Sequence, residues 1–169
     1  TGQASIDCPA ATDCKVAYYD DGDEDITFAD CNDASCSAPA ITDIDTAAGT
    51  TGKASIDCPA ATDCKVAYFD GTDQDITFAD CNDASCSAPV ITDIDTAVGS
   101  DGQASIYCPA ATDCKVAYFD SADNDITFAD CNDASCSAPA ITDIDTAAAN
   151  NATGQASIDC PAATDCKVA

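Results

Sequence analysis

The chain has 169 residues, with 31 acidic side chains against five lysines and a formal net charge of −26. This charge excludes nucleic acid as a partner, because almost nothing is present to neutralise phosphates, and it disfavours an anionic membrane surface. No apolar run approaches the roughly 20 residues that a membrane span needs, so we expect no membrane insertion. The 14 cysteines, with no histidine beside them, indicate a disulfide scaffold instead.

Internal repetition dominates the sequence. Residues 1–50, 51–100 and 101–152 are three copies of one text, and residues 153–169 begin a fourth copy with its first two strands. The first two copies differ at 8 of 50 aligned positions, several of them in the loop after Tyr19 and near the junction at residues 47–52. Arrays of this kind provide length, avidity or mechanical continuity, whereas an active site needs one unique constellation. We therefore predict that the chain is not an enzyme.

Each full copy contains four short segments with the alternating pattern of β-strands. Turn-forming residues bound them and recur about every ten residues, which disfavours helix. In the first copy the predicted strands are Ala4–Cys8, Lys15–Asp20, Asp25–Cys31 and Ala40–Asp45. The sequence thus predicts an all-β protein made of tandem, four-stranded, antiparallel sheet modules.

The second and third strands of the first copy carry most of its bulky side chains. We expect one face of the sheet to hold Val16, Tyr18, Ile26 and Phe28. The opposite face would then be lined by the small residues Ala17, Thr27 and Ala29. One module cannot bury enough apolar surface to offset the chain entropy that it loses, so neighbouring modules must stack and share a core.

The cysteines occur in pairs with the spacings C-x5-C and C-x4-C. Structural zinc sites typically use C-x2-4-C pairs and often histidine, so disulfides and an oxidising, extracellular or cell-surface setting are the better interpretation. Four cysteines allow three pairings. Local pairing is favoured, because the partial fourth copy carries only the first pair. The predicted bonds join Cys8 with Cys14, Cys31 with Cys36, Cys58 with Cys64, Cys81 with Cys86, Cys108 with Cys114, Cys131 with Cys136, and Cys160 with Cys166.

The copies also resemble a known kind of repeat. The resemblance is carried by the series S-I…V-A-Y-[YF]-D…D-I-T-F-A-D-C-N-D-A-S-C…I-T-D-I-D, above all by Tyr18-Tyr19-Asp20 and by the segment from Cys31 to Cys36. This series is similar to tandem repeats of comparable length in large secreted bacterial proteins, which are similar to β-propeller blades. The resemblance covers residues 1–169 and implies a blade-like fold and an extracellular setting, but no definite activity. The segment from Cys8 to Cys14 departs from it, since a plain turn is expected there.

The number and phase of the copies bear on how the modules assemble. Closed propellers usually have about four to eight blades, and many seal the ring by sharing one blade between the two termini. Here both ends of the sequence carry the same strands, so three and a half copies in this phase do not close a ring. We expect an open array of stacked blade-like modules with disulfide-clipped hairpins, which continues past residue 169 or meets another chain.

The loop between the second and third strands keeps the pattern D-x-x-D-x-D in all three full copies. Calcium takes about six to eight oxygen ligands, which clustered carboxylates and loop carbonyls can supply. The net negative charge favours bound counter-ions. The alternative is a solvated hairpin turn, in which aspartate hydrogen-bonds its own backbone. The candidate calcium ligands are Asp20, Asp23, Asp25, Asp70, Asp73, Asp75, Asp120, Asp123 and Asp125.

Asp43 and Asp45 lie two apart on one predicted strand, so we expect their carboxylates to face the same way. A carboxylate pair is the minimum for glycoside hydrolysis. This pair, however, recurs in each full copy and has no histidine or arginine to assist it. We interpret it as charge that keeps an exposed edge strand soluble.

A glycosylation pattern stands at the third junction. Asn151-Ala152-Thr153 matches N-x-T, and two extra residues lengthen this junction relative to the others. Asn151 is therefore a candidate for N-glycosylation, although patterns this short also arise by chance.

These observations lead to two functional hypotheses. The first is a structural segment of a secreted filament or cell-surface stalk, in which the main partner of a module is another copy of itself, within one long chain or in a homopolymer. The second is a calcium-dependent adhesin or a lectin-like, carbohydrate-binding array, in which tyrosines stack on sugars. Glycans are then the partner, and calcium is the sole cofactor expected.

Overall fold

The computed structural model describes residues 3–49, 53–96, 98–100, 102–146 and 155–169, and every regular element in these ranges is a β-strand. Module 1 contains β1 (Ala4–Ala10), β2 (Asp13–Asp20), β3 (Asp25–Cys31) and β4 (Ala40–Asp45). Module 2 contains β5 (Ala54–Ala60), β6 (Asp63–Asp70), β7 (Asp75–Cys81) and β8 (Val90–Asp95). Module 3 contains β9 (Ala104–Ala110), β10 (Asp113–Asp120), β11 (Asp125–Cys131) and β12 (Ala140–Asp145). A terminal hairpin follows, made of β13 (Ile158–Ala162) and β14 (Asp165–Val168).

The four strands of each module pair in chain order as an antiparallel sheet, which confirms the predicted modules. The first hairpin is longer than expected. β1 runs through Pro9 to Ala10, and Ala10 pairs with Asp13 across a two-residue turn. The register shifts between Asp7 and Ala10, a bulge that accommodates proline because Pro9 has no N–H to give to the ladder. The segment between Cys8 and Cys14 is therefore part of the sheet.

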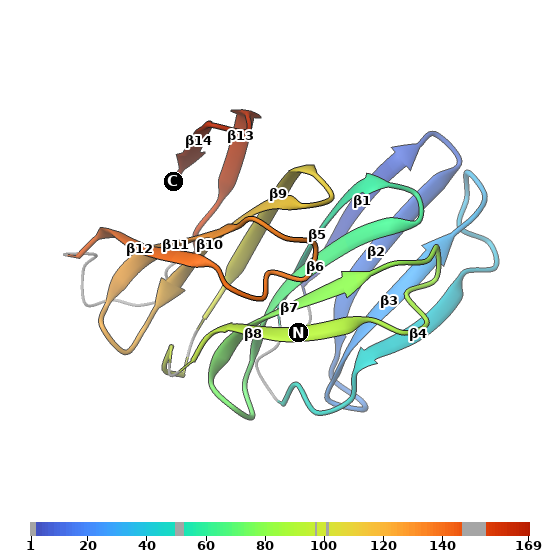
Figure 1. The fold of residues 1–169 in the computed structure, drawn as a ribbon. Coiled ribbons are helices and arrows are strands. Elements are labelled where there is room, and N and C mark those ends of the chain that lie inside the picture. Colours follow the sequence, from blue (N-terminus) through green and yellow to red (C-terminus); the bar gives the residue numbers. More distant parts are fainter. Residues whose placement is uncertain (1–2, 50–52, 97, 101, 147–154) are drawn as a thin grey trace.

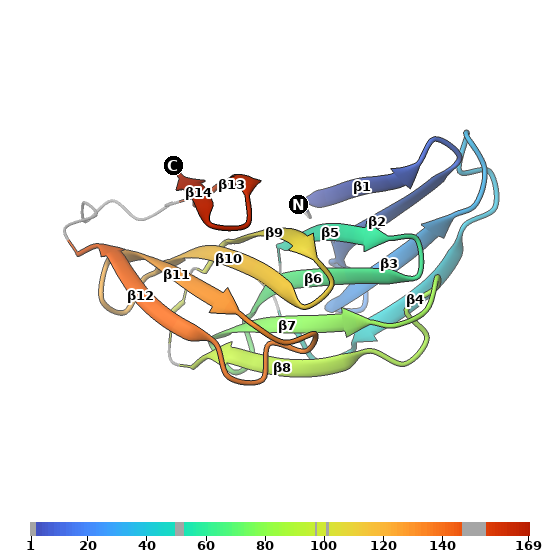
Figure 2. The same ribbon diagram turned by 45° about the horizontal axis from the view of Figure 1, so that its top comes forward.

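The modules are arranged like a fan that opens toward the fourth strands (Figures 1 and 2). The first strands lie side by side, with β5 between β1 and β9, and β13 on the far side of β9. The fourth strands β4, β8 and β12 do not approach one another in this way in the described part of the chain. Stacking is therefore closest at the inner strands.

The strand register assigns the side chains to faces differently from the sequence-based expectation. Val16 lies opposite Ala29 and Tyr18 opposite Thr27, so these four share one face. Ala17 lies opposite Phe28, and the other face also holds Tyr19 and Ile26, which are paired with each other. The expectation of one bulky and one small face was wrong, because facing residues in this hairpin have opposite parity in the sequence. Each face carries large and small side chains together.

The two faces meet between modules, and we name them for that role. The forward face packs on the following module and holds Ala17, Tyr19, Ile26 and Phe28 in module 1. The rear face packs on the preceding module, and in module 2 it holds Ile56, Val66, Tyr68 and Ala79. Modules 2 and 3 repeat the same arrangement with equivalent residues. The hydrophobic core is thus formed between sheets and not within any one of them, since each sheet alone is a single layer.

Disulfides clip each module near the ends of its strands. All 14 cysteines are paired locally, in the C-x5-C and C-x4-C spacings. Cys8–Cys14 bridges the first hairpin, and Cys31–Cys36 closes the loop after β3. Disulfides as numerous as these are typical of proteins that fold in an oxidising compartment. No helix in the described ranges is long and apolar enough to cross a membrane.

Candidate functional site

The junction between two modules is crossed by several hydrogen bonds between polar side chains and backbone groups. The first of these lie between the inner strands. Ser5 Oγ on β1 accepts a hydrogen bond from the backbone N–H of Ile56 on β5, at 3.2 Å. Ser55 and Ser105 repeat this contact with Ile106 and Ile158, each at 3.2 Å. A serine hydroxyl thus replaces the backbone carbonyl that a neighbouring strand would offer, and it holds two sheets together where they come closest.

Carboxylates reinforce the same row. Asp7 Oδ2 accepts from the backbone N–H of Cys58 at 2.8 Å, and Asp57 accepts from that of Cys108 in the next module. Burial is the main cause that raises the pKa of Asp57, and the nearby carboxylate of Asp7 adds to it. Tyr107 stands at the equivalent position of module 3, so the row of carboxylates is interrupted there.

A tyrosine hydroxyl locks the middle of each junction. Tyr68 on the rear face of module 2 donates to Asp45 Oδ2 of module 1 at 2.7 Å, and Tyr118 donates to Asp95 in the same way. Both tyrosine side chains are fully buried. Burial, with the charge of the aspartate and the hydrogen bond to it as further causes, raises the pKa of each phenol far above its ordinary value, so both keep their protons and remain donors.

These contacts correct the expectation that Asp43 and Asp45 face the same way. A bulge between Ile26 and Thr27 shifts the register on β4. Asp43 accepts from Thr27 Oγ1 within its own module at 3.3 Å, whereas Asp45 reaches Tyr68 of the next module. The two carboxylates therefore do not form a pair that could flank a substrate.

The acidic loops contact the linker that leaves the preceding module. The backbone N–H of Gly71 donates to the carbonyl of Ala48 at 2.7 Å, and Thr72 Oγ1 donates to the carbonyl of Ala47 at 2.6 Å. Gly49 adopts a φ of 73°, and a Cβ on it would lie 2.8 Å from the Thr72 backbone nitrogen. Glycine is needed there for both its conformation and its size.

Two of the predicted calcium ligands in module 2 accept hydrogen bonds from groups of their own loop or of the strand that follows it. Asp70 Oδ1 accepts from the backbone N–H groups of Thr72 and Asp73, at 2.7 and 3.2 Å. Asp75 is buried on the rear face and accepts from Thr77 Oγ1 at 3.0 Å. The remaining candidates, Asp20, Asp23, Asp25, Asp73, Asp120, Asp123 and Asp125, occupy the equivalent positions in the three loops.

The charges of these loops are crowded. Burial, with the neighbouring carboxylates of Asp93 and Asp70 as further causes, raises the pKa of Asp75 to about 6. Burial likewise raises the pKa of Asp25 and Asp125 at the equivalent positions. Within the described ranges, no group of three or more aspartate, glutamate or cysteine side chains is arranged to hold a metal ion. Calcium binding by these loops stays a prediction.

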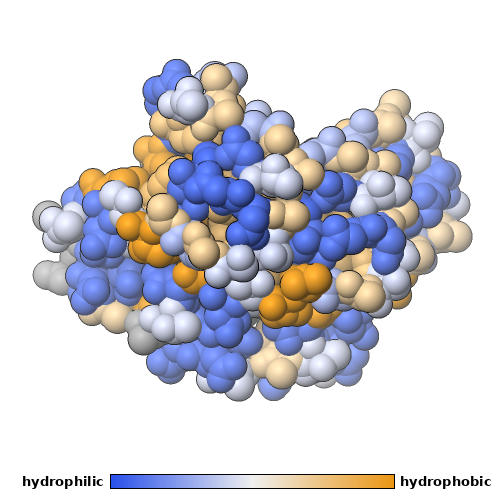
Figure 3. Space-filling model, in the orientation of Figure 1, coloured by the Kyte–Doolittle hydropathy of each residue, from blue (hydrophilic) through white to orange (hydrophobic). Residues whose placement is uncertain are grey.

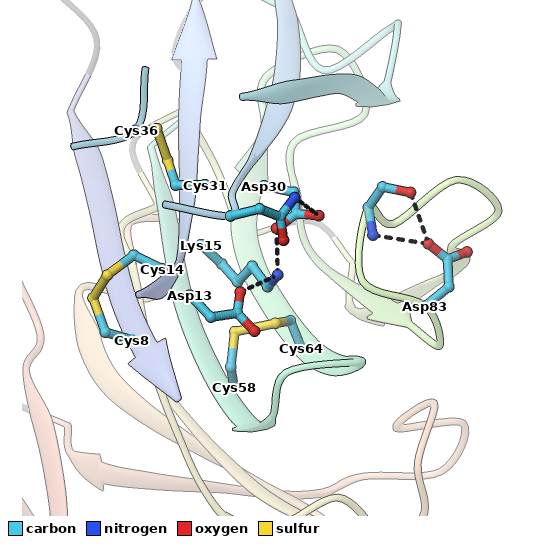
Figure 4. Close-up of polar contacts among 12 residues, drawn as sticks. Cys8, Asp13, Cys14, Lys15, Asp30, Cys31, Cys36, Cys58, Cys64 and Asp83 are labelled. Carbon is cyan, nitrogen blue, oxygen red and sulfur yellow. Dashed lines mark hydrogen bonds and ion pairs between the residues drawn. A yellow bond between two sulfur atoms is a disulfide. The ribbon is translucent and has the colours of Figure 1, made fainter. Parts of the chain in front are cut away.

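A buried lysine on the forward face was not singled out by the sequence analysis. Lys15 lies 2.6 Å from Asp13 on its own strand and also pairs with Asp30 on β3 (Figure 4). Lys65 is paired with Asp63 and Asp80, and Lys115 with Asp113 and Asp130. Burial alone lowers the pKa of Lys15, but hydrogen bonds to its two aspartates outweigh this effect and raise it. The signal available in the sequence was a lysine at one position of every copy in a chain with only five.

The loop closed by the second disulfide is organised by one aspartate. Asp33 accepts from the backbone N–H and hydroxyl of Ser35, both at 2.8 Å, and from the hydroxyl of Ser37 at 2.7 Å. Hydrogen bonds from Ser37 and Ser35 lower the pKa of Asp33 below its usual range. Asp83 makes the same contacts in module 2 with Ser85 and Ser87. Figure 4 draws Asp83 with one residue of this loop. This loop is a self-contained turn, exposed on the surface.

Two hollows are present, one along the inner edge of the stack and one at the end that carries the terminal hairpin. A groove of about 370 Å³ runs along the inner strands and is lined by serine and glutamine side chains, among them Ser5, Ser55, Gln103 and Gln155. A cavity of about 410 Å³ lies between module 3 and the terminal hairpin, beside Lys115 and Phe128. At the two inner junctions a complete following module covers the equivalent lysines.

The outer faces of the array are unlike its junctions. Isoleucines on the fourth strands are exposed in every module, namely Ile41, Ile91 and Ile141. On the face that Figure 3 shows, apolar residues form small, separate patches within a largely hydrophilic surface. The candidate glycosylation residue Asn151 lies outside the described residues.

Comparisons with protein-family models, with curated proteins and with solved structures gave no significant match for this chain.

Proposed function

We propose that this chain is a structural repeat segment of a secreted filament or cell-surface stalk, extended by head-to-tail stacking of its β modules. The observation that carries the proposal is the heterologous junction. Forward and rear faces are different and complementary, and the same contacts recur at both inner junctions. An interface of this type repeats without limit unless its rotation closes a ring.

The rear face of module 1 supports the proposal, because it is an unused copy of that interface. Ile6 is 63% exposed there, whereas its counterparts Ile56 and Ile106 are 6% exposed at the made junctions. Apolar surface of this kind is stabilised when a forward face covers it. The matching occupant is a further module of the same sequence, in the same chain or in another copy.

The high net charge also suits a stalk or filament at the cell surface. A charge of −26 opposes lateral association of arrays, while the apolar junctions still hold modules end to end. The disulfides and the acidic surface support an extracellular location.

Electron microscopy of the purified chain tests the proposal. We expect fibres whose axial repeat corresponds to one module or a small multiple. The variant Ile6→Asp places a charge on the free rear face and should shorten the fibres or abolish them. Ile91→Asp is the matched control, since Ile91 stays 41% exposed at a junction that is already made. Discrete particles of uniform size for the unaltered chain would contradict the proposal.

A carbohydrate-binding array is the second candidate, and the inner groove favours it. Its serine hydroxyls and glutamine amides are uncharged hydrogen-bonding groups of the kind that bind sugar hydroxyls. Glycan-array binding that is lost in Gln103→Ala would support this function. If binding also requires calcium, a chelator should lower both the affinity and the melting temperature, and an unchanged melting temperature would remove the calcium hypothesis.

A further inference from the structure

The triad of one lysine and two aspartates on each forward face is the feature that the stacking of modules does not explain. Lys15 and Asp30 face each other directly across β2 and β3, and Asp13 lies beside Lys15 on the same side of the sheet. The side chains of Lys15 and Lys65 are completely buried, and those of Asp30 and Asp80 are nearly so. The lysine and its cross-strand aspartate are therefore held in contact away from water, while the second aspartate of each triad stays partly exposed.

Such a cluster is a costly way to stabilise a sheet. Removing charges from water is expensive, and an apolar pair of similar volume is often at least as stable as a buried ion pair. The triad carries one positive and two negative charges, and the excess negative charge lies on the partly exposed aspartate beside the buried ion pair. A reaction that removed one charge of each sign would relieve the cost of burying the ion pair, while the net charge of the triad stays negative.

We propose that the lysine and the cross-strand aspartate of the sealed triads condense to an isopeptide bond, Lys15 with Asp30 and Lys65 with Asp80. The reactants are a primary amine and a carboxyl group, and no oxidant or cofactor is needed. The product keeps the strands in register and leaves only Asp13 or Asp63 charged. The bond forms within one chain, whether or not chains assemble.

The neighbouring aspartate supplies the proton transfers. The ammonium proton passes first to Asp30, which gives a neutral amine and a carboxylic acid. The amine nitrogen then attacks Cγ of Asp30, while Asp13 accepts a proton from the nitrogen. Asp13 returns this proton to the departing hydroxyl, which leaves as water. The net change is one ammonium and one carboxylate converted to one amide and one water, with Asp13 unchanged. This is the role of a positioned general acid and base.

Local contacts favour attack on the cross-strand aspartate and not on Asp13. In module 1, Asn32 Nδ2 donates to Asp30 Oδ2 at 3.0 Å and can stabilise the negative charge that develops on that oxygen. Asp13 is more exposed than Asp30, so its charged form is better solvated. Expulsion of water from the closed junction then favours the amide over its hydrolysis.

Two further lysines of the chain, at the same position of the repeat but with more contact with water, serve as comparisons for the triads of modules 1 and 2. At module 3 the triad of Lys115, Asp113 and Asp130 borders the open cavity, so water remains in contact with it. In the terminal hairpin, Lys167 is largely exposed and pairs with Asp165 on its own strand. The described chain holds no third strand opposite Lys167. We expect condensation at the two sealed triads first, and none at Lys167.

Mass spectrometry of the intact, purified chain is the test. The expected mass is lower by two or three water masses than that of the sequence with seven disulfides, and protease digestion should release branched peptides that join Lys15 to Asp30 and Lys65 to Asp80. Lys65→Arg should restore one water mass, and so should Asp80→Ala. Asp63→Asn should slow or prevent the bond in module 2 without affecting module 1.

The variant Asp80→Asn is the matched control for chemistry, because an amide side chain loses ammonia and yields the same bond. It should therefore give the branched peptide and the same final mass as the unaltered chain. The full, uncondensed mass in the unaltered chain overturns the proposal without recourse to any variant. A deficit of fewer than two waters, or links found only at Lys115 or Lys167, overturns it as well.

Discussion

The rear faces of modules 1 and 2 present the same residues in two environments. Ile56 and Tyr68 are buried against module 1, whereas Ile6 is exposed and Tyr18 is only partly covered on the free face. The sequences of the two faces are nearly the same, so the difference comes from the neighbour alone. In this molecule a residue belongs to the core because another module covers it. The contribution of a repeat to the stability of the fold therefore comes largely from its junctions.

The largest expected effect concerns the phenylalanine of the forward face, which is covered by a full module in one case and by the terminal hairpin in the other. Phe78 is fully buried between modules 2 and 3, whereas Phe128 lies beside the cavity at the terminal hairpin and is only partly buried. Phe78→Ala should cost about 3–5 kcal/mol, because it leaves a cavity in a sealed junction. Phe128→Ala should cost clearly less. Urea unfolding of the disulfide-intact variants measures both, and equal losses would show that the junctions do not carry the stability.

A smaller effect is expected where one module's glycine lies against its neighbour. A Cβ on Gly102 would lie 2.6 Å from Cδ2 of Phe69 in module 2. Gly102→Ala should therefore destabilise the second junction by about 1–3 kcal/mol through overpacking. Gly22→Ala is the control, since a Cβ on Gly22 would meet only the side chain of Asp20, at 3.1 Å. Thermal unfolding should distinguish the two, and an equal change in melting temperature would count against close packing at Gly102.

The hydroxyl group of the rear-face tyrosine allows the covered and the uncovered face to be compared by removing one atom. Tyr68→Phe removes the hydroxyl that donates to Asp45 and leaves a partly buried carboxylate without that donor. Its expected cost is about 1.5–3 kcal/mol, the range for a hydrogen bond to a charged group. Tyr18→Phe should cost less, because Tyr18 is only partly buried and its hydroxyl meets no aspartate of another module among the described residues. If both variants unfold alike in urea, the contact with Asp45 contributes nothing measurable.

Acidity provides the mildest test. The pKa of Asp75 is raised to about 6 in the folded chain, above its ordinary value of 3.8. The folded state therefore binds this proton more tightly, so its contribution to stability is complete below about 3.8 and is lost as pH rises through about 6. Lowering the pH from 7 to about 4.5 should stabilise the chain by at most roughly 2 kcal/mol for this group. Asp75→Asn should flatten the dependence, which melting temperatures across this range would reveal.

Acidification below the ordinary pKa of aspartate should instead lower the stability of the chain. The pKa values of Asp33, Asp83 and Asp133 are lowered, chiefly by hydrogen bonds from the serines of their own loops. The stability that these carboxylates provide is present above their ordinary pKa and is lost as pH falls below it. We therefore expect the stability of the chain to be greatest at mildly acidic pH. A maximum at pH 7 or above would contradict both assignments.

Much of the fold could be predicted from local pattern. The alternation and the turn residues located all four strands of each module, because these signals act over a few residues and need no knowledge of neighbours. The faces could not be predicted in this way. Both faces of the sheet become buried at junctions, so the apolar pattern does not select one, and the pairing of Tyr18 with Thr27 depends on the geometry of the turn.

The candidate site was predicted less well, for a related reason. The aspartates of the acidic loops were found because they cluster in the sequence. The partners of Lys15 were missed because Asp30 is far from it along the chain and meets it only across two paired strands. The bulge that separates Asp43 from Asp45 likewise has no marker in the residues themselves.

By itself, the sequence determined the modules, their strands and the local pairing of cysteines, since each of these depends on residues close together in the chain. Only the tertiary structure decided which side chains are core, which carboxylates meet a tyrosine or a lysine, and which surface is left uncovered. The physical reason is that a single sheet of this chain has two faces and no interior. Its interior is created when the forward face of one module closes on the rear face of the next.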